Sequence, residues 1–195
     1  MPINSYHKND YRPFKKGESL PKVSTTLDSV RAYQFEVQFF GLPPSLSNQQ
    51  QDLTLAAKRV NSISMGVEDI PVHRVNDTVF YPGRPSFDSL SIDFDNLYLR
   101  NTCKTLWEWF KTIYDPISGD MTKLSAPGGP GNRTFKANKL RIIELDNTRT
   151  PHAAIELYGV YPKSVNFSEK NYSTNEFATV SVDFRFDFMD YFNYS

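Results

Sequence analysis

The sequence predicts a mainly β protein of the α+β class, an antiparallel β-sandwich or barrel with one flanking α-helix. Apolar and polar residues alternate strictly in two distant segments, 33–39 and 180–188, as half-buried strands require. A single segment, 99–114, repeats apolar residues at spacings of three and four, as an amphipathic helix does. Fifteen Phe and eleven Tyr among 195 residues also favour strands. The length suits one domain, residues 30–195, preceded by an arm.

The arm, residues 1–29, is polar and contains several prolines, which suits an extended segment that a neighbour orders. Its aromatic side chains, Tyr6, Tyr11 and Phe14, are therefore candidate interface residues. The arm has no apolar run, so it predicts neither a signal peptide nor a transmembrane span.

Strands and turns follow the first strand in a regular order. A polar loop is expected at 45–52 and a second strand at 55–65. Two β-branched stretches, 67–75 and 78–81, flank Asn76-Asp77 and predict a hairpin. The run Tyr-Pro-Gly-Arg-Pro, 81–85, predicts a break, and alternation resumes in a strand at 90–94.

The predicted helix places one apolar stripe against a sheet, and Asp115-Pro116 ends it. The stripe contains Cys103, Leu106, Trp107, Phe110, Ile113 and Tyr114. Trp109 falls outside the stripe, so it is either an interface residue or a second core contact. A Gly- and Pro-rich loop is expected at 115–134, followed by strands at 135–145, 153–161 and 180–188.

No set of residues in the sequence predicts catalysis, a cofactor or a metal. The lone Cys103 lies on the helical stripe and fits a buried thiol better than a nucleophile. The other candidates have simpler interpretations: separated surface histidines (His7, His73, His152), solvated strand carboxylates (Asp93, Asp95) and a glycine-rich surface loop (127–133). We therefore expect a protein that is not an enzyme.

The charges balance, with twenty-two basic and twenty-two acidic residues. No long-range attraction to nucleic acid or to a membrane is therefore expected.

The order of several segments carries a family resemblance. These segments are Tyr-Gln-Phe-Glu-Val (33–37), Glu-Asp-Ile-Pro-Val (68–72), Arg-Pro-Ser-Phe-Asp-Ser-Leu-Ser-Ile (84–92), Leu-Trp-Glu-Trp-Phe (106–110), Tyr-Gly-Val-Tyr-Pro (158–162) and the aromatic last strand. Together they resemble the tail tube proteins of contractile-tailed bacteriophages, which share their fold with the tube protein of type VI secretion systems. The resemblance covers about residues 30–192, and Tyr161 stands where that family commonly has Trp.

The resemblance implies a structural subunit whose hairpins join those of sister copies into a continuous inner β-barrel. Six copies would form a ring, and stacked rings would form a tube in the virion tail, assembled in the host cytoplasm. The implied partners are the chain itself, a contractile sheath protein, and baseplate and tail-terminator proteins. DNA would pass through the tube during ejection without specific binding, and no membrane is involved.

A basic channel lining would bind phosphates and slow the DNA, so we expect a polar lining that is neutral to acidic. The candidate lining or ring-contact residues are Glu68, Asp69, His73, Arg74, Asp77, Glu144 and Glu156.

Two alternatives remain open. The first is a tube initiator or secretion-type tube protein with the same fold. The second is a monomeric β-barrel that binds a small ligand in an apolar cavity.

Overall fold

The computed structural model describes residues 30–121, 135–173 and 175–194, and it confirms a mainly antiparallel β fold. The elements are β1 (Phe35–Phe40), η2 (Pro44–Gln49), α2 (Gln50–Ala56), β2 (Ala57–Val60), β3 (Met65–His73), β4 (Thr78–Phe87), β5 (Leu90–Asp95), α3 (Thr102–Lys111), β6 (Ala137–Leu145), β7 (Pro151–Phe167), β8 (Thr179–Arg185) and β9 (Phe188–Asn193). The arm at 1–29, with Tyr6, Tyr11 and Phe14, and most of the Gly- and Pro-rich segment, 122–134, lie outside the described residues.

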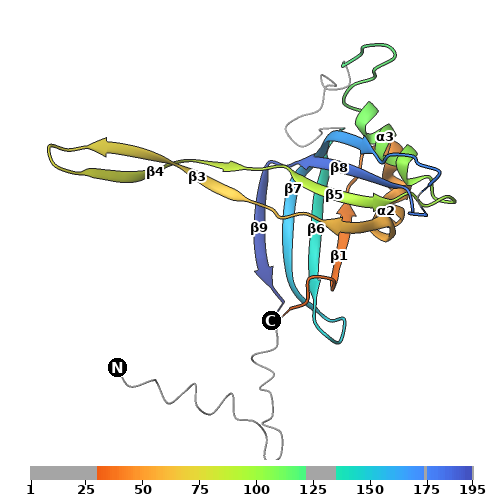
Figure 1. Cartoon of the computed structure of the whole chain (residues 1–195), viewed down its shortest axis with the longest axis horizontal. Helices are drawn as coiled ribbons and strands as arrows, with labels where there is room; N and C mark the ends of the chain where they lie inside the picture. The colour runs from red at the N-terminus through yellow and green to blue at the C-terminus, as the bar shows by residue number, and fades with distance from the viewer. Residues whose placement is uncertain (1–29, 122–134, 174, 195) are drawn as a thin grey trace, which may run out of the picture.

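Two sheets share the long strand β7. Its first part pairs with β6 and β9, and β6 pairs in turn with β1, which gives a four-stranded sheet in the order β1-β6-β7-β9. Its last part pairs with β8, which continues through β5 to β2. Figure 1 shows the first sheet running down the body while β8 and β5 cross it near the top. The two sheets thus form the two layers of a sandwich.

The core lies between the sheets and is closed by the helices. Alternate residues of β5 and β8 face inward, as do alternate residues of β1 and β6. Four aromatic rings meet at the centre, and the Phe39 ring lies 6.0 Å from both Trp109 and Phe184. The Phe39–Trp109 pair is edge-to-face, an arrangement that stabilises a core beyond the area it buries. The body is therefore packed without help from another chain.

Strand β7 changes sheets at Gly159, whose φ of +68° is in the left-handed region. A Cβ at this position would clash with the carboxylate of Asp187. Asp187 donates its backbone N–H to the Tyr158 carbonyl, and its carboxylate accepts a 2.6 Å hydrogen bond from Lys136 Nζ. The corner between the sheets is thus fixed by a glycine and an ion pair.

The predicted helix is confirmed as α3, but its buried face is rotated from the predicted stripe. The inward residues are Thr102, Thr105, Leu106 and Trp109. Trp109 is fully buried, and its Nε1–H donates to the Phe135 carbonyl at 2.8 Å. Of its two predicted roles, the second core contact is therefore confirmed and the interface role is wrong. Two threonines on the core face shift the helix, and a pattern based only on apolar residues could not reveal them.

Other sequence expectations need correction. The loop expected at 45–52 is helical, with Pro44 at the start of η2 and buried Leu46 and Leu53 as anchors. The strand expected at 55–65 is reduced to β2 at 57–60. The last strand ends at Arg185, and Phe188 begins the separate strand β9.

The chain does not leave the strand at 81–85, since β4 runs through both Pro82 and Pro85. The pairing is irregular there, however, because the register with β3 shifts between Val67, opposite Pro85, and Asp69, opposite Pro82. Proline lacks an N–H and is confined to strand positions that need no donor. Among the described residues, no further strand pairs with either side of the two-stranded ribbon β3–β4, so the ribbon offers such positions.

Candidate assembly surfaces

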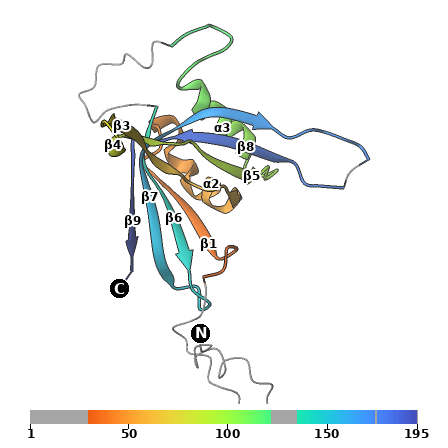
Figure 2. The same ribbon diagram turned by 60° about the vertical axis from the view of Figure 1, so that its left-hand side comes forward.

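The four-stranded sheet ends in two strands that pair on one side only. Within the described residues, β1 pairs only with β6, and β9 pairs only with β7. Each is six residues long, and neither contains Lys, Arg or Pro. Figure 2 shows the four strands side by side, with β9 and β1 at opposite margins. Exposed edges without these protective residues invite another strand to pair.

The edge strand of the second sheet, β2, differs from β1 and β9 in length and charge. It has only four residues, and two of them are Lys58 and Arg59. Lys58 Nζ lies 3.1 Å from the Asp95 carboxylate on the neighbouring strand β5. Short, charged edges resist pairing with another chain. The contrast singles out β1 and β9 as the margins suited to pairing with another chain.

The strand directions of this sheet suit closure with sister copies. Each neighbour in β1-β6-β7-β9 is antiparallel to the next, so β1 and β9 run in opposite directions. When β9 of one copy lies beside β1 of the next, those two strands are also antiparallel. Repeating this contact gives a head-to-tail ring with antiparallel pairing throughout.

The β3–β4 hairpin projects from the body as a two-stranded ribbon (Figure 1). Ile70 pairs with Tyr81 and Val72 with Val79, which puts four apolar side chains on one face. Ile70, Val72 and Tyr81 are exposed. An isolated hairpin is marginal in water, so this apolar face suits a contact with another chain.

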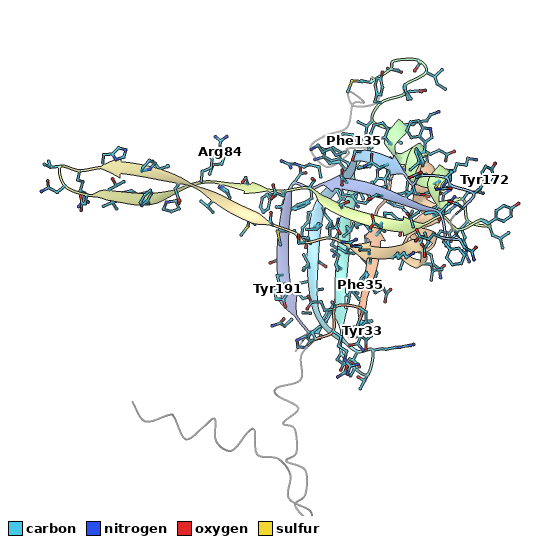
Figure 3. The ribbon with its side chains drawn as sticks, viewed as in Figure 1. Tyr33, Phe35, Arg84, Phe135, Tyr172 and Tyr191 are labelled. Atoms are coloured by element: carbon cyan, nitrogen blue, oxygen red, sulfur yellow. The ribbon has the colours of Figure 1, made fainter. Side chains whose placement is uncertain are left out.

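Five predicted lining residues lie together on this hairpin. Glu68, Asp69 and His73 are exposed on β3, and Arg74 and Asp77 are exposed in the turn. The His73 ring contacts the Thr78 hydroxyl, and the Arg74 N–H donates to the Asp77 carbonyl at 2.8 Å. Figure 3 shows the β3–β4 hairpin, on which Arg84 is labelled, extending away from Phe35 on β1 and Tyr191 on β9. The structure therefore separates these five from Glu144 and Glu156.

Glu144 and Glu156 belong to the four-stranded sheet. Glu144 is half-buried near the end of β6, where it pairs with Phe35 and Ala153. Glu156 lies on the face of β7 directed away from the core, yet only 5% of it is exposed because neighbouring side chains cover it. Lys139 Nζ lies 2.8 Å and Arg141 Nη2 2.5 Å from the same carboxylate oxygen, and the Tyr158 hydroxyl donates to the other.

This network sets the charge of Glu156. Desolvation raises the pKa of its carboxyl, but the hydrogen bonds from Lys139, Tyr158 and Arg141 together outweigh it and lower the pKa to about 2. The hydrogen bond to Glu156 raises the pKa of the Tyr158 hydroxyl in turn. Glu156 is therefore an anion at any physiological pH.

Sequence patterns did not identify Lys139, Arg141 or Tyr158 as partners of Glu156, nor the β1 and β9 margins. All of these depend on strand order and register, which pair residues far apart in the chain. Alternation along β6 and β7 puts Lys139 and Arg141 on one face of β6 and Glu156 and Tyr158 on one face of β7. That these are the same face of the sheet follows only from the pairing of the two strands.

The described residues contain no group of three or more His, Cys, Asp or Glu that could hold a metal ion. Cys103 is half-buried, and burial raises the pKa of its thiol, which disfavours a reactive thiolate. No helix in the described ranges is both long and apolar enough to cross a membrane.

Solved structures with the same fold come from contractile injection systems. One is a sheath–tube complex of an extracellular contractile injection system, PVC, in its extended state (TM-score 0.65, 11% identity, 90% of this chain and 100% of that chain). Another is the tube-terminating cap of the anti-feeding prophage (TM-score 0.62, 12% identity, 88% and 99%). A third is the six-fold symmetrised baseplate of the same prophage (TM-score 0.56, 12% identity, 90% and 97%).

In sequence, no protein-family model and no curated protein matches this chain. The structural likeness nevertheless confirms the tail-tube fold that the sequence predicted.

Proposed function

We propose that this chain is a non-enzymatic structural subunit that closes into rings, which stack into a tube. The observation that carries the proposal is the pair of open strands β1 and β9 on one four-stranded sheet. They are of equal length, contain no Lys, Arg or Pro, and are antiparallel to each other, so one contact repeated around an axis pairs both edge strands. The sheet then becomes a continuous barrel whose hole is the channel.

The ring contains six copies in this proposal, each giving four strands to the inner wall. The anti-feeding prophage baseplate, which contains a chain of similar fold, is six-fold symmetrised, and this supports the number. The apolar face of the β3–β4 hairpin then packs on a neighbouring copy, in the same ring or the next. These two contacts use different parts of the chain, so rings and stacks can form without competing for one surface.

The tube serves in a contractile bacteriophage tail, where it conducts DNA during ejection inside a sheath. Its partners are the chain itself, the sheath protein, and the baseplate and terminator proteins at the two ends. Similar folds in a sheath–tube complex and in a baseplate support this set of partners. DNA passes without specific binding, and the tube needs no cofactor and contacts no membrane.

A component of the tube's end is a second candidate, because a tube-terminating cap has nearly the same similarity to this chain as the sheath–tube complex. A cap or initiator forms a single ring, whereas a tube subunit adds rings without limit. The assembly's length therefore separates the two roles.

The test is the state of the purified full-length chain. Mass photometry across a wide concentration range should show a discrete ring, and negative-stain images at high concentration should show hollow tubes. Single rings alone would indicate the end component. A monomer at every concentration, with no rings in the images, would contradict both candidates and favour a small ligand-binding β protein.

A further inference from the structure

Two cationic side chains meet at one carboxylate oxygen of Glu156 on the outward face of the four-stranded sheet. Lys139 Nζ lies 2.8 Å from Oε1 of Glu156, and Arg141 approaches the same atom with Nε at 2.7 Å and Nη2 at 2.5 Å. Strand register explains the meeting, since Arg141 is directly opposite Glu156 and Lys139 is opposite Tyr158. Two cations thus share one anion of the same chain.

Aromatic rings surround these cations. Lys139 Nζ lies 5.3 Å from the Phe40 ring centre and 5.9 Å from that of Tyr158. The Arg141 guanidinium lies 5.3 Å from the Phe40 ring and 5.9 Å from the Phe192 ring. Basic groups between aromatic rings on an open sheet are the features with which proteins hold nucleic acid.

The carboxylates decide whether this face attracts a polyanion. By register, the outward residues of the four strands include three acidic side chains, Glu36, Glu156 and Asp190, against the two cations, which leaves a net charge of −1. Glu36 is held by Gln38, whose Nε2 donates to it at 2.9 Å. Glu156 alone of the three accepts hydrogen bonds from both cations.

We infer that Glu156 is an internal counter-ion that occupies Lys139 and Arg141, so that this aromatic and basic face does not bind DNA. The inference rests on the proposed function in one respect: the face matters for DNA only if it lines the channel. The low pKa of Glu156 supports it, because the carboxylate stays charged at neutral and mildly acidic pH. To reach either cation, a DNA phosphate would have to displace the buried carboxylate of Glu156, which is hydrogen-bonded to both cations.

The experiment compares the soluble full-length chain with Glu156→Gln in binding a fluorescein-labelled DNA duplex of about 20 base pairs. Glutamine keeps the shape of the side chain but leaves two cations uncompensated. At about 50 mM salt we expect the variant to bind the duplex about fivefold more tightly than the unmodified chain. The slope of log K against log salt should steepen by about one to two, as two added phosphate contacts imply.

Glu36→Gln is the matched control, since it removes one negative charge from the same face without touching Lys139 or Arg141. Its affinity for the duplex should stay within about twofold of the unmodified chain. The double variant Glu156→Gln with Arg141→Gln guards against misfolding, because it also relieves the repulsion between the two cations. It frees Lys139 alone, so its salt slope should steepen by about one.

The outcomes test the counter-ion role of Glu156 independently of the proposed tube. If the single and double variants both bind the duplex no more tightly than the unmodified chain, the counter-ion role is overturned, whether or not tubes form. Equal gains for Glu156→Gln and Glu36→Gln would also overturn it, since net charge would then explain both. Tighter binding by Glu156→Gln from a chain that forms no ring supports the counter-ion role while contradicting the tube.

Discussion

The sandwich body and the β3–β4 hairpin contain the same kinds of residue but differ in what covers them. In β8, Val180, Val182 and Phe184 are completely buried between the sheets. In the hairpin, Ile70 and Tyr81 are 52% and 50% exposed, although they too belong to strands with an apolar face. An apolar face in the sequence therefore predicts a strand, but it does not show whether the same chain covers that face. The core of the body is buried within one chain, whereas the apolar face of the hairpin is left exposed.

The largest effect on the stability of a single chain is expected in the body. Trp109→Ala removes a fully buried ring that contacts Phe39 and Phe184, and it leaves the Phe135 carbonyl without its donor. The free energy of unfolding, measured with urea, should fall by about 3–5 kcal/mol. Tyr98→Ala, at a side chain that is almost fully exposed, should change it by less than about 0.5 kcal/mol. A similar loss in both variants would mean that the core is not where the structure puts it.

The corner between the sheets should come next. Gly159→Ala combines a left-handed φ with a clash against Asp187, so we expect a loss of about 2–4 kcal/mol in unfolding free energy. Gly119 has a similar φ of +69°, but no atom lies within 4 Å of the point that an added Cβ would occupy. Gly119→Ala should therefore lose only about 1 kcal/mol, and the difference between the variants isolates the contact with Asp187. Equal losses would show that the backbone conformation alone sets the cost.

A smaller effect depends on pH. The folded-state pKa of Glu156 is lowered to about 2 from an ordinary 4.5, so its stabilisation is complete above pH 4.5 and disappears as the pH falls towards 2. We expect the stability difference between the unmodified chain and Glu156→Gln to shrink by about 1–2 kcal/mol between pH 7 and pH 2, allowing for solvent screening. Urea unfolding at several pH values measures it. A difference that stays constant with pH would show that the ion pairs contribute nothing through the charge of Glu156.

The smallest effect on single-chain stability is expected in the hairpin. Ile70→Ser combined with Tyr81→Ser removes a cross-strand apolar pair that the body does not cover. Unfolding free energy should change by less than about 0.5 kcal/mol, while tubes in negative-stain images should disappear. Phe80→Ser, an exposed residue on the opposite face of the same hairpin, should weaken assembly less. Normal tubes from the double variant would show that the apolar face makes no contact between copies.

Sequence patterns predicted the fold where local chemistry determines it. The β1, β5 and β6 strands, α3 and the hairpin turn were all expected at nearly their observed positions. The patterns failed where a distant partner decides the outcome. The buried face of α3 includes Thr102 and Thr105, which the apolar stripe did not contain, and β4 continues through Pro82.

The assembly surfaces were harder to predict for the same reason. The hairpin carboxylates are exposed as a polar pattern suggests, but Glu156 is covered by Lys139 and Arg141, which reach it across a strand pairing. The β1 and β9 segments look like ordinary strands in the sequence. Only the order of strands in the sheet shows that they are edge strands.

The joint between copies is the central claim, and a cryo-EM reconstruction of the assembled particle that resolves individual strands tests it most directly. We expect β9 of each copy to be hydrogen-bonded antiparallel to β1 of the next, with four strands from every copy in an unbroken inner barrel. A reconstruction in which copies meet through β2 or the helices, leaving β1 and β9 without strand partners, would contradict it.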